Sequence, residues 1–204
     1  MEGGWDDLAP HWQAAFELMW EAYGAGALPV GAVVTDGAGA IVARARNRIA
    51  EPHGGAVAGT RLAHAEINAL LQLPATSAYP DHTIHSTLEP CLLCYGAVSM
   101  SRVGAIAYAA ADPYAGACHV EIDIPVVRNA PIAVSGPLEG WPAALSQALV
   151  IATLTRMGRP YRVVELFPPE AHESARRLLH SRPGIETGVG LAAALPHLRR
   201  NVLA

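Results

Sequence analysis

Two short segments concentrate the residues of this chain that could carry chemistry. The first is His64-Ala65-Glu66, and the second runs from Thr87 to Cys94 and ends in a Cys-x-x-Cys pair. Each segment alone is a weak signal, because a His-x-Glu pair is common in helices without function. A lone Cys-x-x-Cys pair fits a redox site, a structural zinc knuckle or two buried thiols. The two segments therefore have to be interpreted together.

Together, the segments supply a ligand set that suits zinc. His64, Cys91 and Cys94 offer one nitrogen and two sulfurs, which zinc accepts in tetrahedral geometry. Each segment begins a predicted helix, where backbone N–H groups and the helix dipole favour thiolates. A structural zinc site is normally closed by a fourth protein ligand. Only three are visible here, so we expect one zinc ion per chain with water or hydroxide as its fourth ligand, which indicates catalysis.

Glu66 is the residue that we expect to move protons. It follows His64 by two residues and therefore points ~200° around a helix axis from that ligand. In the first helical turn it can still line the same cavity without binding the metal. A redox thiol protein built on Cys91 and Cys94 would leave His64 and Glu66 without a role.

These segments resemble the zinc motifs of the cytidine deaminase-like superfamily, whose known signature combines His-x-Glu with Pro-Cys-x-x-Cys. Within it, the chain is most similar to the branch of tRNA adenosine deaminases, guanine deaminases and fungal-type cytosine deaminases. The resemblance covers roughly residues 10–120. The matching stretches are Pro29–Val34, Asn47, His64–Glu66, Thr87–Cys94, Gly96-Ala97 and Ala111-Asp112.

The resemblance implies an α/β fold, namely a three-layer α/β/α sandwich with a mixed sheet of about five strands and helices on both faces. It also implies hydrolysis of an exocyclic amino group with release of ammonia, and Glu66 as the catalytic acid and base. The substrate contacts that it implies come from Pro29, Asn47, Ala65 and Asp112. The alternative for Asn47 is a turn residue that ends a strand, and for Asp112 it is a strand-end cap.

Hydrophobic periodicity and turn residues indicate the elements that must position these side chains. In the first half we expect a helix between Pro10 and Gly24, a hairpin of residues 31–35 and 40–46, a helix over about 62–73, a strand over 83–87, a helix over 91–100 and a strand over 105–109. Beyond Asp112 we expect a helix over 143–157, a strand over 161–167, a helix over 169–180 and a loosely packed tail from Pro183.

Length and composition predict one globular domain over residues 1–204, with the motif-bearing core in 1–120 and a C-terminal extension over about 140–204. The first residues show no signal-peptide pattern, and no apolar run approaches the ~20 residues of a membrane span. Three cysteines without a framework of pairs suit a reducing compartment. We therefore expect no membrane association and a cytoplasmic location.

The charge balance favours a small substrate. All 14 basic residues are arginine, and the formal net charge is −4. Neither half of the chain is basic enough to indicate broad binding to a phosphate backbone. Arg44, Arg46 and Arg48 share one strand face and could hold a substrate phosphate, although a solvated face is the favoured interpretation. The leading prediction is a deaminase of a free nucleobase, nucleoside or related small heterocycle, acting in nucleobase or nucleoside metabolism.

Two other functions remain open. One is a tRNA adenosine deaminase that forms inosine, since its motifs match about equally well. The other is a non-catalytic, zinc-stabilised deaminase-like module, against which the intact Glu66 argues.

The resemblance also implies a homodimer. For Cys118-His119 a second metal site is possible in principle, but a buried thiol beside a loop histidine is favoured. The ring that is deaminated and the roles of residues 48–63 and 120–204 are not given by these patterns.

Overall fold

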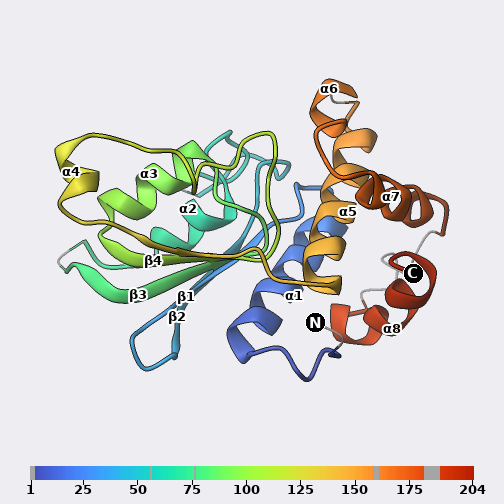
Figure 1. Ribbon diagram of the computed structural model, residues 1–204, viewed down its shortest axis with the longest axis horizontal. Coiled ribbons are helices and arrows are strands. Elements are labelled where there is room, and N and C mark those ends of the chain that lie inside the picture. The colour runs from blue at the N-terminus through green and yellow to red at the C-terminus, as the bar shows by residue number, and fades with distance from the viewer. Residues whose placement is uncertain (1–2, 56, 76, 159–160, 182–188) are drawn as a thin grey trace.

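The computed structural model describes residues 3–55, 57–75, 77–158, 161–181 and 189–204. Its centre is one mixed sheet with the strand order β2-β1-β3-β4-β5 (Figure 1). β1 (Gly31–Thr35) and β2 (Ile41–Arg46) form an antiparallel hairpin, and β1 also pairs antiparallel with β3 (Tyr79–Ser86). β4 (Val103–Tyr108) and β5 (Ala133–Ser135) continue the sheet in parallel. The predicted mixed sheet of about five strands is confirmed.

The parallel strand pairs determine where the cysteine segment lies. Parallel strands need a crossover connection, and α3 (Leu92–Met100) provides it between β3 and β4. The short helix α4 (Pro125–Arg128) lies in the connection from β4 to β5. The chain therefore passes from the carboxyl end of β3 through residues 87–91 directly into α3, which brings the Cys-x-x-Cys pair to this edge of the sheet.

Helices cover both faces of the sheet. All five residues of β1 are buried, which requires cover on both sides. α1 (Pro10–Gly24) packs on β1 and β2 so closely that a Cβ added to Gly31 would lie 2.1 Å from the carbonyl oxygen of Ala15. α2 (Ala65–Leu70) contacts the same two strands and lies beside α3 on the other face (Figure 1). The three-layer sandwich is therefore confirmed.

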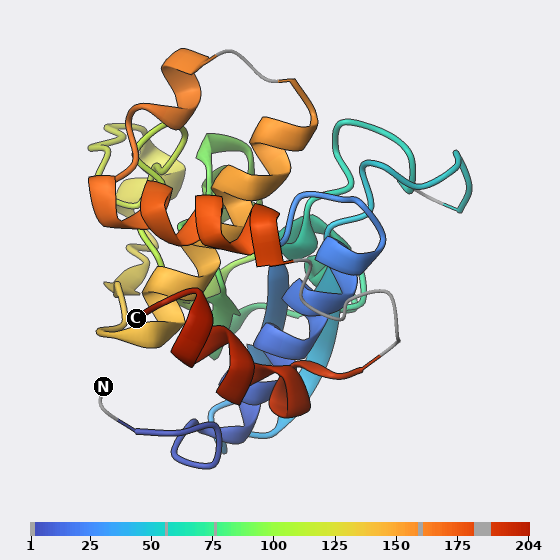
Figure 2. The ribbon, with the colours of Figure 1, turned by 90° about the vertical axis from the view of Figure 1, so that its right-hand side faces the viewer.

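Four C-terminal helices gather on one side of the molecule, at the end away from α4 (Figures 1 and 2). They are α5 (Trp141–Arg156), α6 (Tyr161–Val164), α7 (Pro169–Ser181) and α8 (Leu191–Asn201). α5 packs on α1, where the rings of Phe16 and Trp141 lie 5.7 Å apart, and α7 packs on α5.

The last helix is joined to the first by a carboxylate. Glu17 in α1 accepts hydrogen bonds from the backbone N–H groups of Leu191 and Ala192, at 2.9 and 3.0 Å. A carboxylate suits the N-terminus of a helix because the N–H groups there lack partners within the helix. Most of the buried hydrophobic residues that the structure describes form one cluster, which extends from Leu8 to Val202.

Two secondary-structure predictions for this extension are wrong. The predicted strand over 161–167 contains the helix α6 instead, and this helix contacts α5, so packing against a helix overrides the β propensity of the segment. The predicted loose tail contains α8, whose Leu191, Leu195 and Leu198 are buried together with Val202. These residues recur at helical spacing, so they anchor one face of α8 to the core. Residues 182–188 of that tail lie outside the described part of the chain.

The other predicted elements are present with shifted ends, whereas the short helix α4 and the edge strand β5 lie where no element was predicted. α2 spans residues 65–70 where 62–73 was predicted, and it starts late because His64 has an extended backbone and is its N-cap. β3 begins at Tyr79 where residue 83 was predicted. Among the described residues, no helix combines the length and apolar character that crossing a membrane requires.

Candidate metal centre

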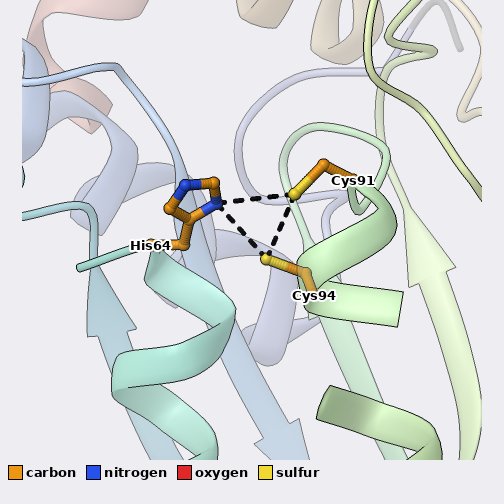
Figure 3. A group of neighbouring side chains, drawn as sticks. All are labelled: His64, Cys91 and Cys94. Carbon is orange, nitrogen blue, oxygen red and sulfur yellow. Dashed lines mark hydrogen bonds between the residues drawn. The ribbon is translucent and has the colours of Figure 1, made fainter. Parts of the chain in front are cut away.

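Two helix N-termini meet at the candidate metal centre. His64 is the N-cap of α2 and Cys91 is the N-cap of α3, and neither side chain caps its own helix with a hydrogen bond. Both side chains are therefore free to point away from their helices and toward each other. Cys94 follows one turn later in α3 and lies on the same side of that helix as Cys91. Figure 3 shows the three side chains converging from α2 and α3.

The spacing of the three ligand atoms fits a tetrahedral zinc ion. Cys91 Sγ lies 3.6 Å from His64 Nδ1 and 3.7 Å from Cys94 Sγ, and Cys94 Sγ lies 3.4 Å from Nδ1 (Figure 3). Usual zinc bond lengths in a tetrahedron separate two sulfurs by about 3.8 Å, and a sulfur from a nitrogen by about 3.6 Å. Within the described ranges, no other group of His, Cys, Asp and Glu brings three such atoms together.

The two cysteines already differ in acidity. The contact with Cys94 and that with His64 lower the pKa of the Cys91 thiol to about 4, although burial opposes this shift. The same Cys91 contact and burial raise the pKa of Cys94. Cys91 is therefore the more acidic of the two thiols, and a bound dication would deprotonate Cys94 as well as Cys91. Two thiolates and a neutral imidazole would balance the charge of Zn²⁺.

Glu66 lies beside this group, and its two carboxylate oxygens have different hydrogen-bond partners. Its carboxylate is buried, and burial raises its pKa. Oε1 accepts a hydrogen bond from Ser86 Oγ at 2.9 Å. Oε2 accepts from Cys94 Sγ at 3.4 Å and so faces the ligand group. One oxygen is anchored to the sheet, while the other is placed where it can exchange a proton next to a metal.

A cavity of about 440 Å³ opens at this group. His64, Glu66 and Cys91 line it, as do two of the predicted substrate-binding residues, Asn47 and Asp112. The structure therefore brings together five of the predicted site residues around one cavity. Cys94 lies behind it, fully buried.

Asn47 is oriented by its neighbour along the chain. It is buried, and its Oδ1 accepts a hydrogen bond from the backbone N–H of Ile49 at 3.1 Å. The amide oxygen is thereby engaged, which leaves the NH₂ group as the part of the side chain that can serve a ligand as donor.

Asp112 makes the local hydrogen bonds of a strand-end cap, which was the alternative to a substrate-binding role. Its Oδ1 accepts from the N–H groups of Tyr114 and Ala115, at 2.9 and 3.1 Å. Because Asp112 also lines the cavity, the cap and a contact to substrate are compatible. Its role toward a substrate stays a prediction.

Pro29 and Ala65 are buried, and the residues that line the cavity do not include them. Their neighbours Leu28, Val30 and Glu66 line it instead. A substrate contact from Pro29 or Ala65 stays a prediction.

Glu89 lines the cavity although the sequence patterns did not single it out as a site residue. It is buried, and its carboxylate accepts from the N–H of Asp112 at 3.3 Å and of Cys118 at 3.1 Å. The sequence does contain a signal for Glu89, because it places a charged residue between Leu88 and Pro90, just after a buried strand. A carboxylate buried there needs hydrogen-bond partners. Glu89 fixes the loop after β4 against the cavity.

The other charged and metal-binding candidates lie outside this site. Arg46 and Arg48 pair with Glu51 at 2.5 and 2.7 Å, and neither lines the cavity. His119 Nε2 is hydrogen-bonded to the hydroxyl of Tyr108 at 2.9 Å. Cys118 is buried, which agrees with the favoured interpretation of a buried thiol beside a loop histidine.

Known proteins are similar to this chain over the region that carries the centre. The family model for the cytidine and deoxycytidylate deaminase zinc-binding region matches residues 7–110. The chain is 33% identical over 126 residues to a tRNA-specific adenosine deaminase of Agrobacterium fabrum, covering 58% of this chain and 77% of that protein. It is 44% identical over 93 residues to a tRNA(Ile)-lysidine synthase of Deinococcus radiodurans, but this spans only 15% of that protein and 44% of this chain.

Solved structures show the same fold. A structure from a study of tRNA:A34 deaminases at the wobble position matches with a TM-score of 0.53 and 29% identity, over 62% of this chain and 96% of that one. A guanine deaminase of Nitrosomonas europaea matches with a TM-score of 0.52 and 23% identity, over 72% of this chain and 85% of that one. The second likeness concerns the fold alone.

Proposed function

The chain belongs to the family that shares the cytidine and deoxycytidylate deaminase zinc-binding region, and on that premise we propose that it hydrolyses an exocyclic amino group on a free nucleobase, nucleoside or related small heterocycle. Water replaces the amino group, so that the products are the ring carbonyl compound and ammonia. The observation that carries this proposal is the placement of the Glu66 carboxylate beside a three-ligand zinc site at one cavity.

His64, Cys91 and Cys94 would hold the zinc ion, and they leave room for a fourth ligand. When bound, zinc lowers the pKa of a coordinated water to about 7, which supplies a nucleophile at neutral pH. The chain's own contribution is to hold the three ligands at the ends of two packed helices. Because both helix N-termini point at the site, their N–H groups favour the negative charge of the thiolates.

Glu66 would move the protons. Its Oε2 faces the ligand group and can take a proton from the attacking water, then give it to the ring nitrogen. The same oxygen would later take the second proton of the added water, as the ring carbonyl forms, and give it to the departing amine, because ammonia leaves far more readily than its anion. Burial raises the pKa of Glu66, which helps this carboxylate to hold a proton between the two steps.

Asn47 would orient the ring. Since the N–H of Ile49 engages its Oδ1, its NH₂ group would donate to an acceptor atom of the substrate. A fixed donor of this kind discriminates strongly, because a ring without the acceptor leaves a buried polar group unpaired.

The cavity supports a small substrate. Its 440 Å³ lies within the range of typical small-molecule sites, and helices from the C-terminal extension form part of its wall. The second candidate function, a tRNA adenosine deaminase that forms inosine, is favoured by the sequence identity to the Agrobacterium fabrum protein.

A substrate panel separates the two. Zinc-loaded protein is incubated with free bases, with nucleosides and with a tRNA anticodon stem-loop, and ammonia and inosine are measured. We expect ammonia from at least one small heterocycle. Inosine formed in the stem-loop, with no turnover of any small compound, would replace this proposal with the second candidate. No turnover of either kind by zinc-replete protein would favour a non-catalytic module.

We further propose that the chain forms one domain and assembles as a homodimer. The single buried cluster from Leu8 to Val202 supports one domain. Leu92, Leu93 and Met100 are exposed on α3 and would be covered in a dimer formed by this helix. Light scattering measures the mass in solution, and a monomer would contradict the dimer.

A further inference from the structure

One part of the cavity is built by residues outside the matched region of the family. Val150, Leu154 and Met157 belong to α5 and the turn after it, and Val163 and Phe167 to α6 and the turn after it. We call these five residues the apolar wall. They come from a different part of the molecule than α2 and α3, which carry the zinc ligands (Figure 1). All five lie beyond residue 110, where the family match ends.

The apolar wall contains none of the cavity's polar side chains. Its side chains are aliphatic or aromatic or carry a thioether, so they offer a ligand no strong hydrogen bond. The polar groups of the cavity come from the metal centre and its surroundings, chiefly Glu66, Asn47 and Asp112. A ring whose amino group lies at the metal centre would thus turn its remaining part toward apolar side chains.

The cavity also holds more than a bare ring. At the ~30 Å³ that a water molecule occupies in the liquid, 440 Å³ corresponds to about fifteen waters, whereas a purine has about ten heavy atoms. The additional space can take a substituent of the ring, and an apolar wall favours an apolar one because its burial removes hydrophobic surface from water.

The charges of the cavity argue against a phosphate. Three carboxylates line it, from Glu66, Glu89 and Asp112, and no arginine is among the described residues that line it. The whole chain lacks lysine. Arg46 in β2 and Arg48 in the loop after it are paired with Glu51. Among the residues that the structure describes around this cavity, a phosphate would therefore meet three carboxylates and no arginine.

We propose that the apolar wall is a substrate subsite, which takes an uncharged apolar substituent of the deaminated ring and discriminates against nucleotides. This inference rests on the proposed function, which places the ring at the metal centre. It adds the chemical class of the substituent that the ring carries. Phe167 and Met157 suit an aromatic substituent, since aromatic rings and thioethers pack well against aromatic groups.

The test uses three compounds for each of adenine, guanine and cytosine: the free base, its N-benzyl derivative at the position where a nucleoside carries its sugar, and the nucleoside 5′-monophosphate. Binding to the zinc-loaded full chain is measured by calorimetry, and ammonia release is measured on the same samples. For at least one ring we expect the benzyl derivative to bind about tenfold more tightly than the base. The monophosphate should bind more weakly than either.

Two variants in the wall and one matched control complete the test. Leu154→Ala and Met157→Ala should lower the ratio of benzyl to base affinity by about tenfold. Met157 is 42% exposed, so its truncation should not impair folding. Leu166→Ala is the control, because Leu166 lies in the same segment but is exposed and does not line the cavity.

The outcomes separate this inference from the proposed function. A benzyl preference that both wall variants reduce, and Leu166→Ala does not, supports the subsite even where no ammonia is released, in which case only the proposed reaction fails. A monophosphate that binds as tightly as the benzyl derivative overturns the subsite. The subsite is also overturned if neither wall variant changes the ratio of benzyl to base affinity, whether or not ammonia is released.

Discussion

Ser86 Oγ donates a 2.9 Å hydrogen bond to Glu66 Oε1, and both side chains are buried at the carboxyl end of β3. This contact fixes one oxygen of the carboxylate to the sheet. The other oxygen is left facing Cys94 Sγ at 3.4 Å. The position of the proposed proton carrier therefore depends on a strand residue that touches neither the metal ligands nor the cavity.

Ser86→Ala should impair turnover without removing zinc. A hydrogen bond to a charged group contributes about 1.5–3 kcal/mol, so we expect kcat to fall by about tenfold or more while KM changes little. Ser99→Ala is the matched control, since Ser99 is also buried and its hydroxyl has no hydrogen-bond partner among the described residues. A Ser86→Ala enzyme with wild-type kcat would show that the contact does not position Glu66.

Zinc content should depend on two of the three cysteines. Cys91→Ser and Cys94→Ser each remove a thiolate from the three-ligand group, so purified protein should contain far less than one zinc ion per chain. Cys118→Ser should keep the full zinc content, because Cys118 lies outside that group. Inductively coupled plasma mass spectrometry measures the metal. Full zinc in either ligand variant would refute the proposed ligand set.

The group of His64, Cys91 and Cys94 could be predicted from the sequence, because the spacing is local to two short segments and each begins a helix. The strands β1 to β4 could be predicted for the same reason, from alternating patterns and turn residues, whereas the short edge strand β5 could not. Val163 and Val164 favoured a strand, but packing on α5 made the segment helical. The apolar wall could not be predicted, because its residues reach the cavity only through the way in which α5 packs on α1.

Stability should fall as the pH falls below about 6.5, through His85. Burial, reinforced by the neighbouring charge of His11, lowers the pKa of His85 to about 3 in the folded chain. The unfolded chain therefore binds a proton in a pH range where the folded chain does not. The stabilisation is complete above the unfolded pKa and is lost as the pH falls from there toward 3.

Urea unfolding at pH 7.5 and pH 5.0 measures this effect. Between these values the free energy of unfolding should drop by about 2 kcal/mol more in the wild type than in His85→Gln. Loss of zinc in acid affects both proteins, so the difference between them isolates His85. His53→Gln, which replaces an exposed histidine, should behave as the wild type does. Equal pH dependence in all three proteins would contradict the prediction.

Glu17→Ala should destabilise the whole fold. The carboxylate of Glu17 satisfies the first N–H groups of α8, and loss of such a cap costs about 1–2 kcal/mol. Glu21→Ala is the control, since Glu21 lies one turn further along α1 and is an exposed partner of Arg46 at 3.7 Å. Chemical denaturation should give one transition. A separate early transition of the C-terminal helices would contradict the single domain.

Glu66→Gln tests the role of Glu66 as the proton carrier, with zinc content and ammonia release measured for the variant and the wild type on the same samples. Glutamine keeps the size of the side chain but cannot take up and release the proton. We expect one zinc ion per chain in both proteins and a turnover that is ~10²–10⁴-fold lower in the variant. A Glu66→Gln protein that holds zinc and releases ammonia at the wild-type rate would contradict this role.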